Sequence, residues 1–247
     1  MELKDFFQEH PKAALAFSGG VDSTYLLRAA LDCGADVRPY CVSSAFQPAF
    51  EKAEAEDLCA RMGVELTVLP VDVLCDSAVT ANPPDRCYHC KKHILTAIRE
   101  RAAADGYTVL LDGTNASDDA GDRPGMRALQ EFGVLSPLLL CSLTKDEIRR
   151  RSRELGLPTW DKPAYACLAT RVPTGTEITK ELLARVEGAE TALLGLGYRD
   201  FRVRVFHDAA RLQLPKAELA RAAGEAEALR SALAPWFQTV LLDLEGR

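Results

Sequence analysis

The sequence contains no apolar run of the roughly 18–20 residues that a membrane-spanning helix requires. Acidic residues and a proline occur in residues 1–17, where a secretion signal would have basic and then apolar residues. Basic residues are too few to favour a large polyanionic partner such as tRNA, because 30 lysines and arginines stand against 36 acidic residues. We therefore expect a soluble, cytoplasmic protein with no membrane partner, and the charge balance disfavours a nucleic-acid partner.

The chain is long enough for a large α/β domain with a small appendage, and 47% of its 247 residues are hydrophobic. Short β-like runs alternate with helical spacing through residues 1–172, which predicts a parallel sheet covered by helices on both faces. The pattern changes at the linker VPTGT, and residues 173–247 are predicted to form a small α+β domain. The expected elements include strands at 13–17, 36–44, 64–73 and 108–114 and a long helix at 216–232.

The most specific stretch is AFSGGVDST, residues 16–24, which follows a predicted strand and begins a predicted helix. Gly19 and Gly20 permit a tight turn that brings backbone N–H groups close to a ligand, and the helix dipole favours an anion there. The lysine of a GxxxxGK[ST] loop is absent, and so is the GxGxxG pattern of dinucleotide-binding folds. The stretch therefore predicts a phosphate-binding loop of another kind.

The pattern SGGxDS between a strand and a helix resembles the PP-loop of the ATP pyrophosphatase superfamily, whose fold is called adenine nucleotide alpha-hydrolase-like. These enzymes cut ATP between its α and β phosphates, adenylate a carbonyl-type oxygen and let a nucleophile displace AMP. The resemblance implies that the chain uses ATP and Mg²⁺, and that Asp22 helps to place the metal ion during catalysis. The residues expected to bind ATP are Ser18, Gly19, Gly20, Asp22, Ser23, Thr24, Ser43, Gly113, Thr114, Asn115 and Arg123.

Six further stretches resemble the LarE family of ATP-dependent sacrificial sulfur transferases over nearly the whole chain. They are NPPDRCYHCK, LLDGTNASDDAGDRPG, SPL, LTKDEIR, LGLPTWDKPAYACLATRVPTGTEIT and FRVRVFHDAAR. The family acts in nickel-pincer cofactor biosynthesis, where ATP adenylates a carboxylate of pyridinium-3,5-biscarboxylic acid mononucleotide and sulfur then displaces AMP to give a thiocarboxylate. Because the family forms hexamers, the resemblance also implies a homo-oligomer.

The resemblance extends to arginines that would hold the substrate. Arg202 and Arg204 alternate on one face of a predicted strand, and the family uses arginines here for the nucleotide phosphate of its substrate. Arg171 is expected to act in catalysis and substrate binding. An exposed strand face is the alternative interpretation of Arg202 and Arg204.

Four further polar residues have more than one interpretation. Gln213 stands where we expect an acidic residue, so a metal or interface role of that carboxylate is in doubt. Glu190 is another candidate for such a role. Asp118 and Asp119 belong to the loop after the fourth predicted strand, and a solvated loop is an alternative interpretation for both.

Three cysteines are candidates for the chemistry of sulfur. Cys167 stands at the position that some family members sacrifice, which leaves dehydroalanine, whereas Cys87 and Cys90 lie at i and i+3 of a predicted helix. All three fit a 4Fe–4S cluster with one open iron, which could bind a sulfide and deliver it. The alternatives are a sacrificed Cys167 with a redox role for CxxC, zinc completed by His89 or His93, and unligated cysteines. The remaining cysteines are predicted to be small buried residues: Cys33, Cys41, Cys59, Cys75 and Cys141.

Two other functions compete with sulfur transfer to a small molecule. Some tRNA thiolases also join a PP-loop to three cysteines, but the acidic balance of the chain and the lack of an obvious RNA-binding module argue against that function. A nucleotide sensor without catalysis would bind ATP and release neither AMP nor pyrophosphate.

Overall fold

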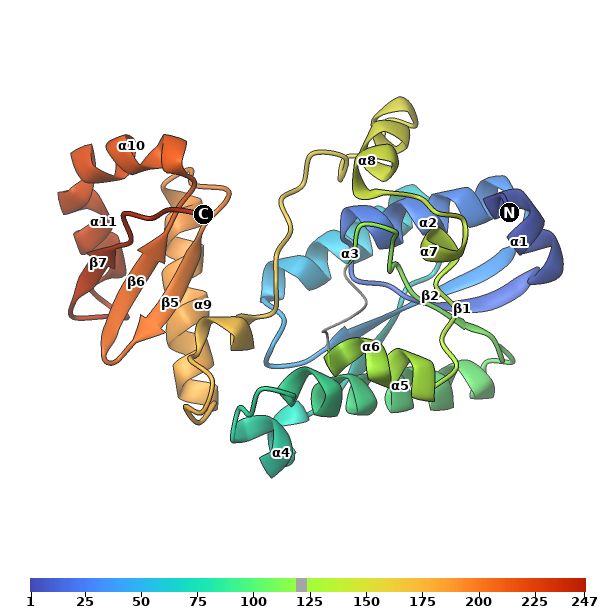
Figure 1. The fold of residues 1–247 in the computed structure, drawn as a ribbon, viewed down its shortest axis with the longest axis horizontal. Helices are drawn as coiled ribbons and strands as arrows, with labels where there is room; N and C mark the ends of the chain where they lie inside the picture. Colours follow the sequence, from blue (N-terminus) through green and yellow to red (C-terminus); the bar gives the residue numbers. More distant parts are fainter. Residues whose placement is uncertain (119–123) are drawn as a thin grey trace. The chain divides into compact units, whose positions relative to one another are not determined.

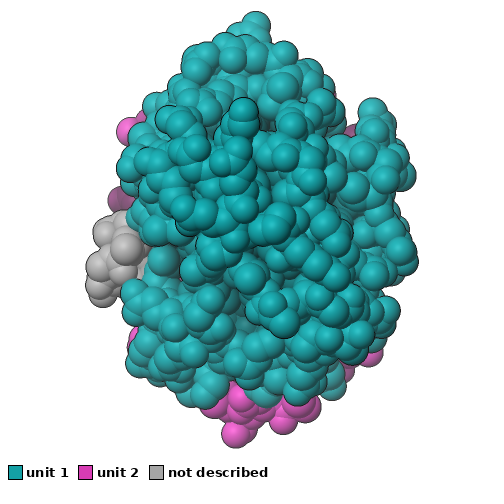
Figure 2. Space-filling model, turned by 90° about the vertical axis from the view of Figure 1, so that its right-hand side faces the viewer, with its two compact units in different colours: residues 1–73, 85–164 teal, residues 74–84, 165–247 magenta. Residues whose placement is uncertain are grey.

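The computed structural model describes residues 1–118 and 124–247, so the predicted sites Asp119 and Arg123 lie outside the described residues. The chain forms two compact units, drawn in teal and magenta in Figure 2. The first contains residues 1–73 and 85–164, and the second contains residues 74–84 and 165–247.

The first unit is built on a four-stranded parallel sheet with the strand order β3-β2-β1-β4. Its strands are β1 (Lys12–Ala16), β2 (Asp36–Ser43), β3 (Thr67–Pro70) and β4 (Leu110–Leu111). Its helices are α1 (Leu3–Glu9), α2 (Val21–Asp32), α3 (Ala49–Arg61), α5 (Arg86–Ala104), α6 (Pro124–Glu131), α7 (Pro137–Leu140) and α8 (Lys145–Glu154). The predicted α/β class with a parallel sheet is confirmed.

The two faces of this sheet carry separate hydrophobic clusters, because successive residues of a strand point to opposite sides. Leu15 of β1 belongs to one cluster together with Leu26 of α2. The neighbouring Ala14 belongs to the other cluster together with Ile98 of α5 and Ala128 of α6. Figure 1 shows α2 and α3 on one side of the sheet and α5 and α6 on the other. Helices therefore cover both faces of the sheet.

The second unit combines a small mixed sheet with helices, as predicted for an α+β domain. Strands β5 and β6 are antiparallel, and β6 and β7 are parallel. The elements are α4 (Ser77–Thr80), η2 (Leu168–Arg171), α9 (Lys180–Gly195), β5 (Arg202–Phe206), β6 (Ala209–Gln213), η3 (Lys216–Glu218), α10 (Leu219–Gly224), α11 (Ala226–Leu233) and β7 (Val240–Leu242). The single helix predicted at 216–232 is wrong, because the helical conformation is interrupted at Glu225, directly after Gly224.

Residues 74–84 belong to the second unit, although along the chain they lie between the two segments that form the first unit. The chain leaves the first unit at η1 (Val73–Cys75). Asn82 then fixes the segment: its side-chain N–H donates to the carbonyl of Pro173 at 2.8 Å, and its own carbonyl accepts from the N–H of Gly175 at 2.8 Å. The domain boundary between residues 172 and 173 stays a prediction.

The part of the chain described by the structure, residues 1–118 and 124–247, holds no helix that is both long and apolar enough to cross a membrane.

Replacing Asn82 tests the attachment of residues 74–84. Asn82 is 1% exposed and has a φ of 52°, a conformation that strains alanine but not glycine. We expect Asn82→Ala to lower the free energy of unfolding by about 2–4 kcal/mol, through the lost hydrogen bonds and backbone strain. Asn82→Gly, the matched variant, should lose about 1–3 kcal/mol because it removes only the hydrogen bonds. Urea unfolding checks both values, and wild-type stability of the two variants would contradict the assignment.

Candidate active site

The loop Phe17–Gly20 joins β1 to α2 and carries the predicted phosphate-binding residues. Gly19 has a φ of +66°, which favours glycine, and Gly20 is the residue that caps the helix. Ser23 donates its hydroxyl to the carbonyl of Gly20 at 3.3 Å and lies 3.2 Å from the hydroxyl of Ser18. The Thr24 hydroxyl is buried without a hydrogen-bond partner among the described residues. The loop is thus tied back onto the first turn of α2, where N–H groups favour an anion.

The end of β4 lies against the amino end of α2. A Cβ atom added to Gly113 would be 3.0 Å from the backbone nitrogen of Ser23, so a larger residue would push the two segments apart. Strand order reverses here, since β2 and β4 flank β1 on opposite sides, and parallel sheets bind ligands at such points. The structure thus brings Gly113, Thr114 and Asn115 close to the loop after β1. Ser43 ends β2 at the same edge of the sheet.

Both oxygens of the Asp22 carboxylate are engaged. Oδ1 accepts from the Asn115 amide at 3.3 Å, and Oδ2 accepts from Lys145 Nζ at 2.5 Å. Asp118, in turn, accepts from the backbone N–H of Asn115 at 3.1 Å and so supports this loop. Because oxygen ligands suit Mg²⁺, the Asp22 carboxylate fits the role expected for it.

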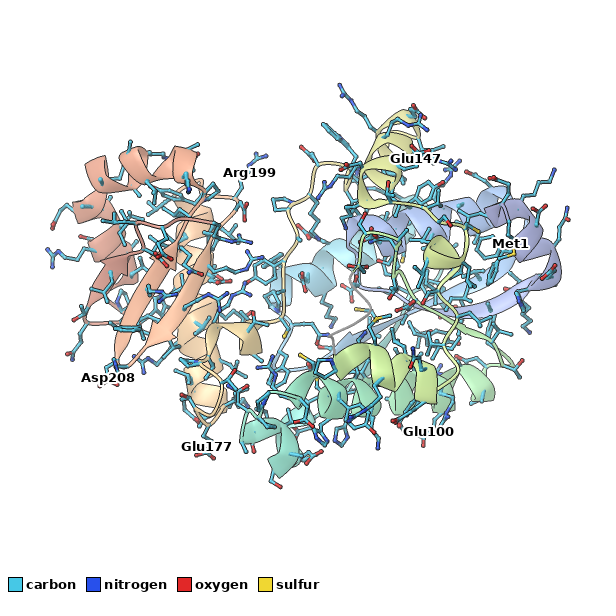
Figure 3. The ribbon with its side chains drawn as sticks, viewed as in Figure 1. Met1, Glu100, Glu147, Glu177, Arg199 and Asp208 are labelled. Atoms are coloured by element: carbon cyan, nitrogen blue, oxygen red, sulfur yellow. The ribbon has the colours of Figure 1, made fainter. Side chains whose placement is uncertain are left out.

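Two lysines supply positive charge beside a loop that has none of its own. Lys145 is the first residue of α8, the helix on which Figure 3 labels Glu147. Lys162 Nζ donates to the carbonyl of Gly19 at 3.1 Å and to the carboxylate of Glu54 at 2.6 Å. Sequence analysis assigned neither lysine a role. Lys145 lies 123 residues from Asp22, so no local spacing could have indicated the pair.

Cys87 and Cys90 lie at the start of α5, as predicted. Helix α5 begins at Arg86, and Cys87 is exposed while Cys90 is partly exposed. The carboxylate of Asp85 makes no capping hydrogen bond and instead lies 3.4 Å from His89 Nε2. Cys167 belongs to the second unit, where it is partly exposed and directly precedes η2.

The prediction for the other cysteines is confirmed only in part. Cys41 and Cys59 are buried, and burial raises the pKa of Cys41 to about 11 and that of Cys59 to about 12. Cys33, which follows the last residue of α2, and Cys75, which ends η1, are exposed, so the prediction is wrong for these two. Cys141 is partly exposed.

The described residues contain no group of three or more histidine, cysteine, aspartate or glutamate side chains arranged to hold a metal ion. Thiolates are the ligands of iron–sulfur clusters, and Cys87, Cys90 and Cys167 are each at least partly exposed, as are Cys33, Cys75 and Cys141. The 4Fe–4S cluster expected on the first three stays a prediction.

Arg171 and Glu190 form a buried ion pair in the second unit. Arg171 Nε and Nη2 donate to the two carboxylate oxygens of Glu190 at 2.8 and 3.1 Å, and both side chains are almost fully buried. The hydroxyl of Tyr165 also donates to Glu190. The Tyr165 ring contacts the guanidinium groups of Arg171 and Arg202, whose central carbons lie 4.7 and 5.3 Å from its centroid.

Arg202 and Arg204 extend this group along β5 and are not an exposed strand face. Burial, and secondarily the charge of Arg171, lowers the pKa of Arg202 to about 10 and lowers that of Arg204 as well. A bound anion would relieve this repulsion, so the arginines are suited to a phosphate. Gln213 accepts from Arg204 Nε at 2.5 Å and donates to Asp243 at 2.7 Å, so a neutral amide links Arg204 to a carboxylate.

The buried thiols allow a test of the cysteine environments. At pH 8 we expect iodoacetamide to modify Cys87 in the native protein and to leave Cys41 and Cys59 intact. A thiol with a pKa of about 11 holds only about a thousandth of its molecules as the reactive thiolate at this pH. Peptide mass spectrometry after timed alkylation measures each site, and the unfolded protein serves as a control in which all should react. Rapid modification of Cys41 in the folded protein would contradict the structure.

Comparisons with known proteins found relatives that transfer sulfur. No family model matches the chain. A protein of Synechocystis sp. that is named as uncharacterized is 38% identical over 99% of the chain and 92% of its own length. The tRNA-specific 2-thiouridylase MnmA of Frankia alni is 25% identical over 60% of the chain and 52% of its own length. Pyridinium-3,5-bisthiocarboxylic acid mononucleotide synthase of Lactiplantibacillus plantarum is 35% identical over 84% of the chain and 76% of its own length. The chain therefore belongs to the LarE family of ATP-dependent sulfur transferases.

Proposed function

We propose that the chain uses ATP to convert a carboxylate of pyridinium-3,5-biscarboxylic acid mononucleotide into a thiocarboxylate, in the biosynthesis of the nickel-pincer cofactor. The observation that carries this proposal is the PP-loop with Asp22 and Lys145 at the point where strand order reverses. The name of the Lactiplantibacillus plantarum relative supports the choice of substrate.

The first step is the adenylation of the substrate. The N–H groups and hydroxyls of the loop after β1 hold the phosphates of ATP, and Asp22 holds Mg²⁺. A carboxylate oxygen of the substrate attacks the α-phosphorus, the bond between the α-phosphorus and the bridging oxygen breaks, and pyrophosphate leaves. Lys145 and Lys162 lie close enough to the loop to offset the negative charge that develops on pyrophosphate.

Two arginines of the second unit are the candidates for binding the substrate phosphate. Arg202 is buried and Arg204 is partly buried, and burial followed by the charge of Arg171 lowers the pKa of both, so they would bind the phosphate of the mononucleotide. Adenylation makes AMP a good leaving group, and a sulfur nucleophile can then attack the carbonyl carbon and displace it.

We propose a 4Fe–4S cluster on Cys87, Cys90 and Cys167 as the source of sulfur. When bound, such a cluster would supply an iron without a protein ligand, at which an external sulfide can be held, so that Cys167 stays intact.

Sacrifice of Cys167 is the alternative source of sulfur. Its thiolate would attack the carbonyl carbon, AMP would leave, and a thioester would form. A base would then take the Cα proton and the Cβ–Sγ bond would break, so that the sulfur leaves as the thiocarboxylate and the residue becomes dehydroalanine. No external oxidant or reductant is needed.

A tRNA thiolase is the second candidate function, and the similarity to MnmA favours it. That similarity covers a smaller part of both chains than the similarity to the synthase, and the net charge of −6 is unfavourable for a phosphate backbone. Tight, salt-sensitive binding of bulk tRNA in a mobility-shift assay would favour the thiolase. The homo-oligomer implied by the resemblance stays a prediction for light scattering to test.

Substitution of the charged residues at the loop tests the adenylation step. We expect Asp22→Asn and Lys145→Gln each to slow substrate-dependent release of pyrophosphate about 100-fold, because each removes a charge that acts on the reacting phosphates. Lys4→Gln makes the same chemical change as Lys145→Gln at an exposed position of α1 and should leave the rate unchanged. A coupled pyrophosphate assay measures the rates. ATP binding with no pyrophosphate release from the wild type would indicate a sensor instead.

Anaerobic purification followed by turnover distinguishes the two sources of sulfur. With a cluster, we expect iron and acid-labile sulfide in the purified protein, their loss in Cys87→Ser, and an unchanged protein mass after turnover. Iron-free wild-type protein that loses the mass of hydrogen sulfide at Cys167 would overturn the cluster and support sacrifice. Cys33→Ser, a change at an exposed cysteine outside the proposed site, is the matched control.

A further inference from the structure

We infer that Glu190 is a positioning residue: its buried carboxylate holds the backbone of Cys167 in a defined place relative to the arginine strand β5. The inference rests on the proposed function for the roles of Cys167, Arg202 and Arg204. In this inference Glu190 acts on catalysis indirectly. It binds Arg171, and Arg171 in turn binds the backbone next to and at Cys167.

The carboxylate of Glu190 has no capacity left for a metal ion. Oε1 accepts from Arg171 Nε at 2.8 Å and from the backbone N–H of Val203 at 2.9 Å. Oε2 accepts from Arg171 Nη2 at 3.1 Å and from the hydroxyl of Tyr165. A carboxylate has about four lone-pair positions, and these four donors occupy them. Glu190 therefore acts through the groups that it binds and is unsuited to the metal role considered for it.

Arg171 carries the constraint from Glu190 to the sulfur-bearing residue. Its Nη1 group donates to the carbonyl of Ala166 at 2.8 Å and lies 3.4 Å from the carbonyl of Cys167. The Cys167 carbonyl also accepts from the backbone N–H of Thr170 at 3.0 Å and from the Thr170 hydroxyl at 2.8 Å. Three donors thus converge on the carbonyl of Cys167, which fixes its backbone while the residue stays partly exposed.

The same carboxylate fixes the strand that carries the phosphate-binding arginines. Val203, whose N–H donates to Glu190, lies between Arg202 and Arg204 on β5. Arg204 Nη1 also donates to the carbonyl of Thr170 at 2.8 Å, which joins β5 to η2 a second time. Glu190 therefore sets the distance between the residue that handles sulfur and the residues that would hold the substrate phosphate. A displacement of about 1 Å between such groups can cost about 100-fold in rate.

Two variants and a matched control test this role in the full-length protein. Glu190→Gln replaces one acceptor oxygen by an amino group and leaves the Arg171 charge uncompensated. Arg171→Lys keeps a charge for Glu190 but cannot reach the carbonyls of Ala166 and Cys167 at the same time. Glu181→Gln makes the same chemical change at an exposed position of the same helix, α9.

The first measurement is sulfur transfer by anaerobically prepared protein. We expect kcat for thiocarboxylate formation to fall about 10- to 100-fold in both variants, whereas the KM for ATP stays within about twofold because the PP-loop belongs to the first unit. Glu181→Gln should match the wild type in both constants. Wild-type kcat in Glu190→Gln or in Arg171→Lys would overturn the inference, and the lysine variant keeps the test valid if Glu190→Gln fails to fold.

The second measurement needs neither ATP nor substrate, so it separates a failure of this inference from a failure of the proposed function. Iodoacetamide reacts with chelator-treated, iron-free protein, and peptide mass spectrometry follows Cys167 and Cys87. We expect a several-fold faster reaction at Cys167 in Glu190→Gln and Arg171→Lys, with an unchanged rate at Cys87. Equal acceleration at both cysteines would indicate general unfolding, and an unchanged rate at Cys167 would show that its backbone is not held in this way. Either result overturns the inference.

Discussion

The close approach of Gly113 to the amino end of α2 is the constraint on which the PP-loop depends. Because glycine leaves no Cβ atom in the space 3.0 Å from the Ser23 nitrogen, the end of β4 can reach the first turn of α2. That contact brings Asn115 to the Asp22 carboxylate, and the loop that follows supports Lys145 through a hydrogen bond from its backbone N–H to the Ser117 hydroxyl. The amino end of α2, where N–H groups favour an anion, thereby lies beside a carboxylate suited to Mg²⁺ and a lysine from α8.

In the second unit, the arrangement of the arginines depends on the buried carboxylate of Glu190. Arg171, Arg202 and Arg204 would repel one another, and Glu190 offsets part of their charge while its four hydrogen bonds join α9, η2 and β5. Mutual repulsion makes the remaining positive charge unfavourable by itself, and a bound phosphate would make it favourable. These arginines thus make the free energy of folding less favourable, and binding of the proposed substrate would offset that cost.

The class of the fold could be predicted from the sequence because strands and helices alternate with distinct periods. The bounds of the first two strands were predicted to within one residue, but the next two strands are shorter than predicted. The strand predicted at 64–73 is confined to Thr67–Pro70, since strand length is set by pairing with β2. The PP-loop was predictable because its residues are contiguous. The Lys145–Asp22 and Glu190–Arg171 pairs join separate elements, so no local pattern indicates them. The burial of Arg202 and the partial burial of Arg204 could not be predicted from the sequence either, because one face of an alternating strand can point to solvent or to a core.

The central claim is that a carboxylate of the substrate becomes bonded to AMP before sulfur attacks. Oxygen-18 in the carboxylates of pyridinium-3,5-biscarboxylic acid mononucleotide tests it most directly, because the oxygen lost on sulfur insertion must leave with AMP. Mass spectrometry of the products after turnover with unlabelled ATP should find one labelled oxygen in each AMP and none in pyrophosphate. Thiocarboxylate formed together with unlabelled AMP, or with ADP and phosphate, would contradict the account.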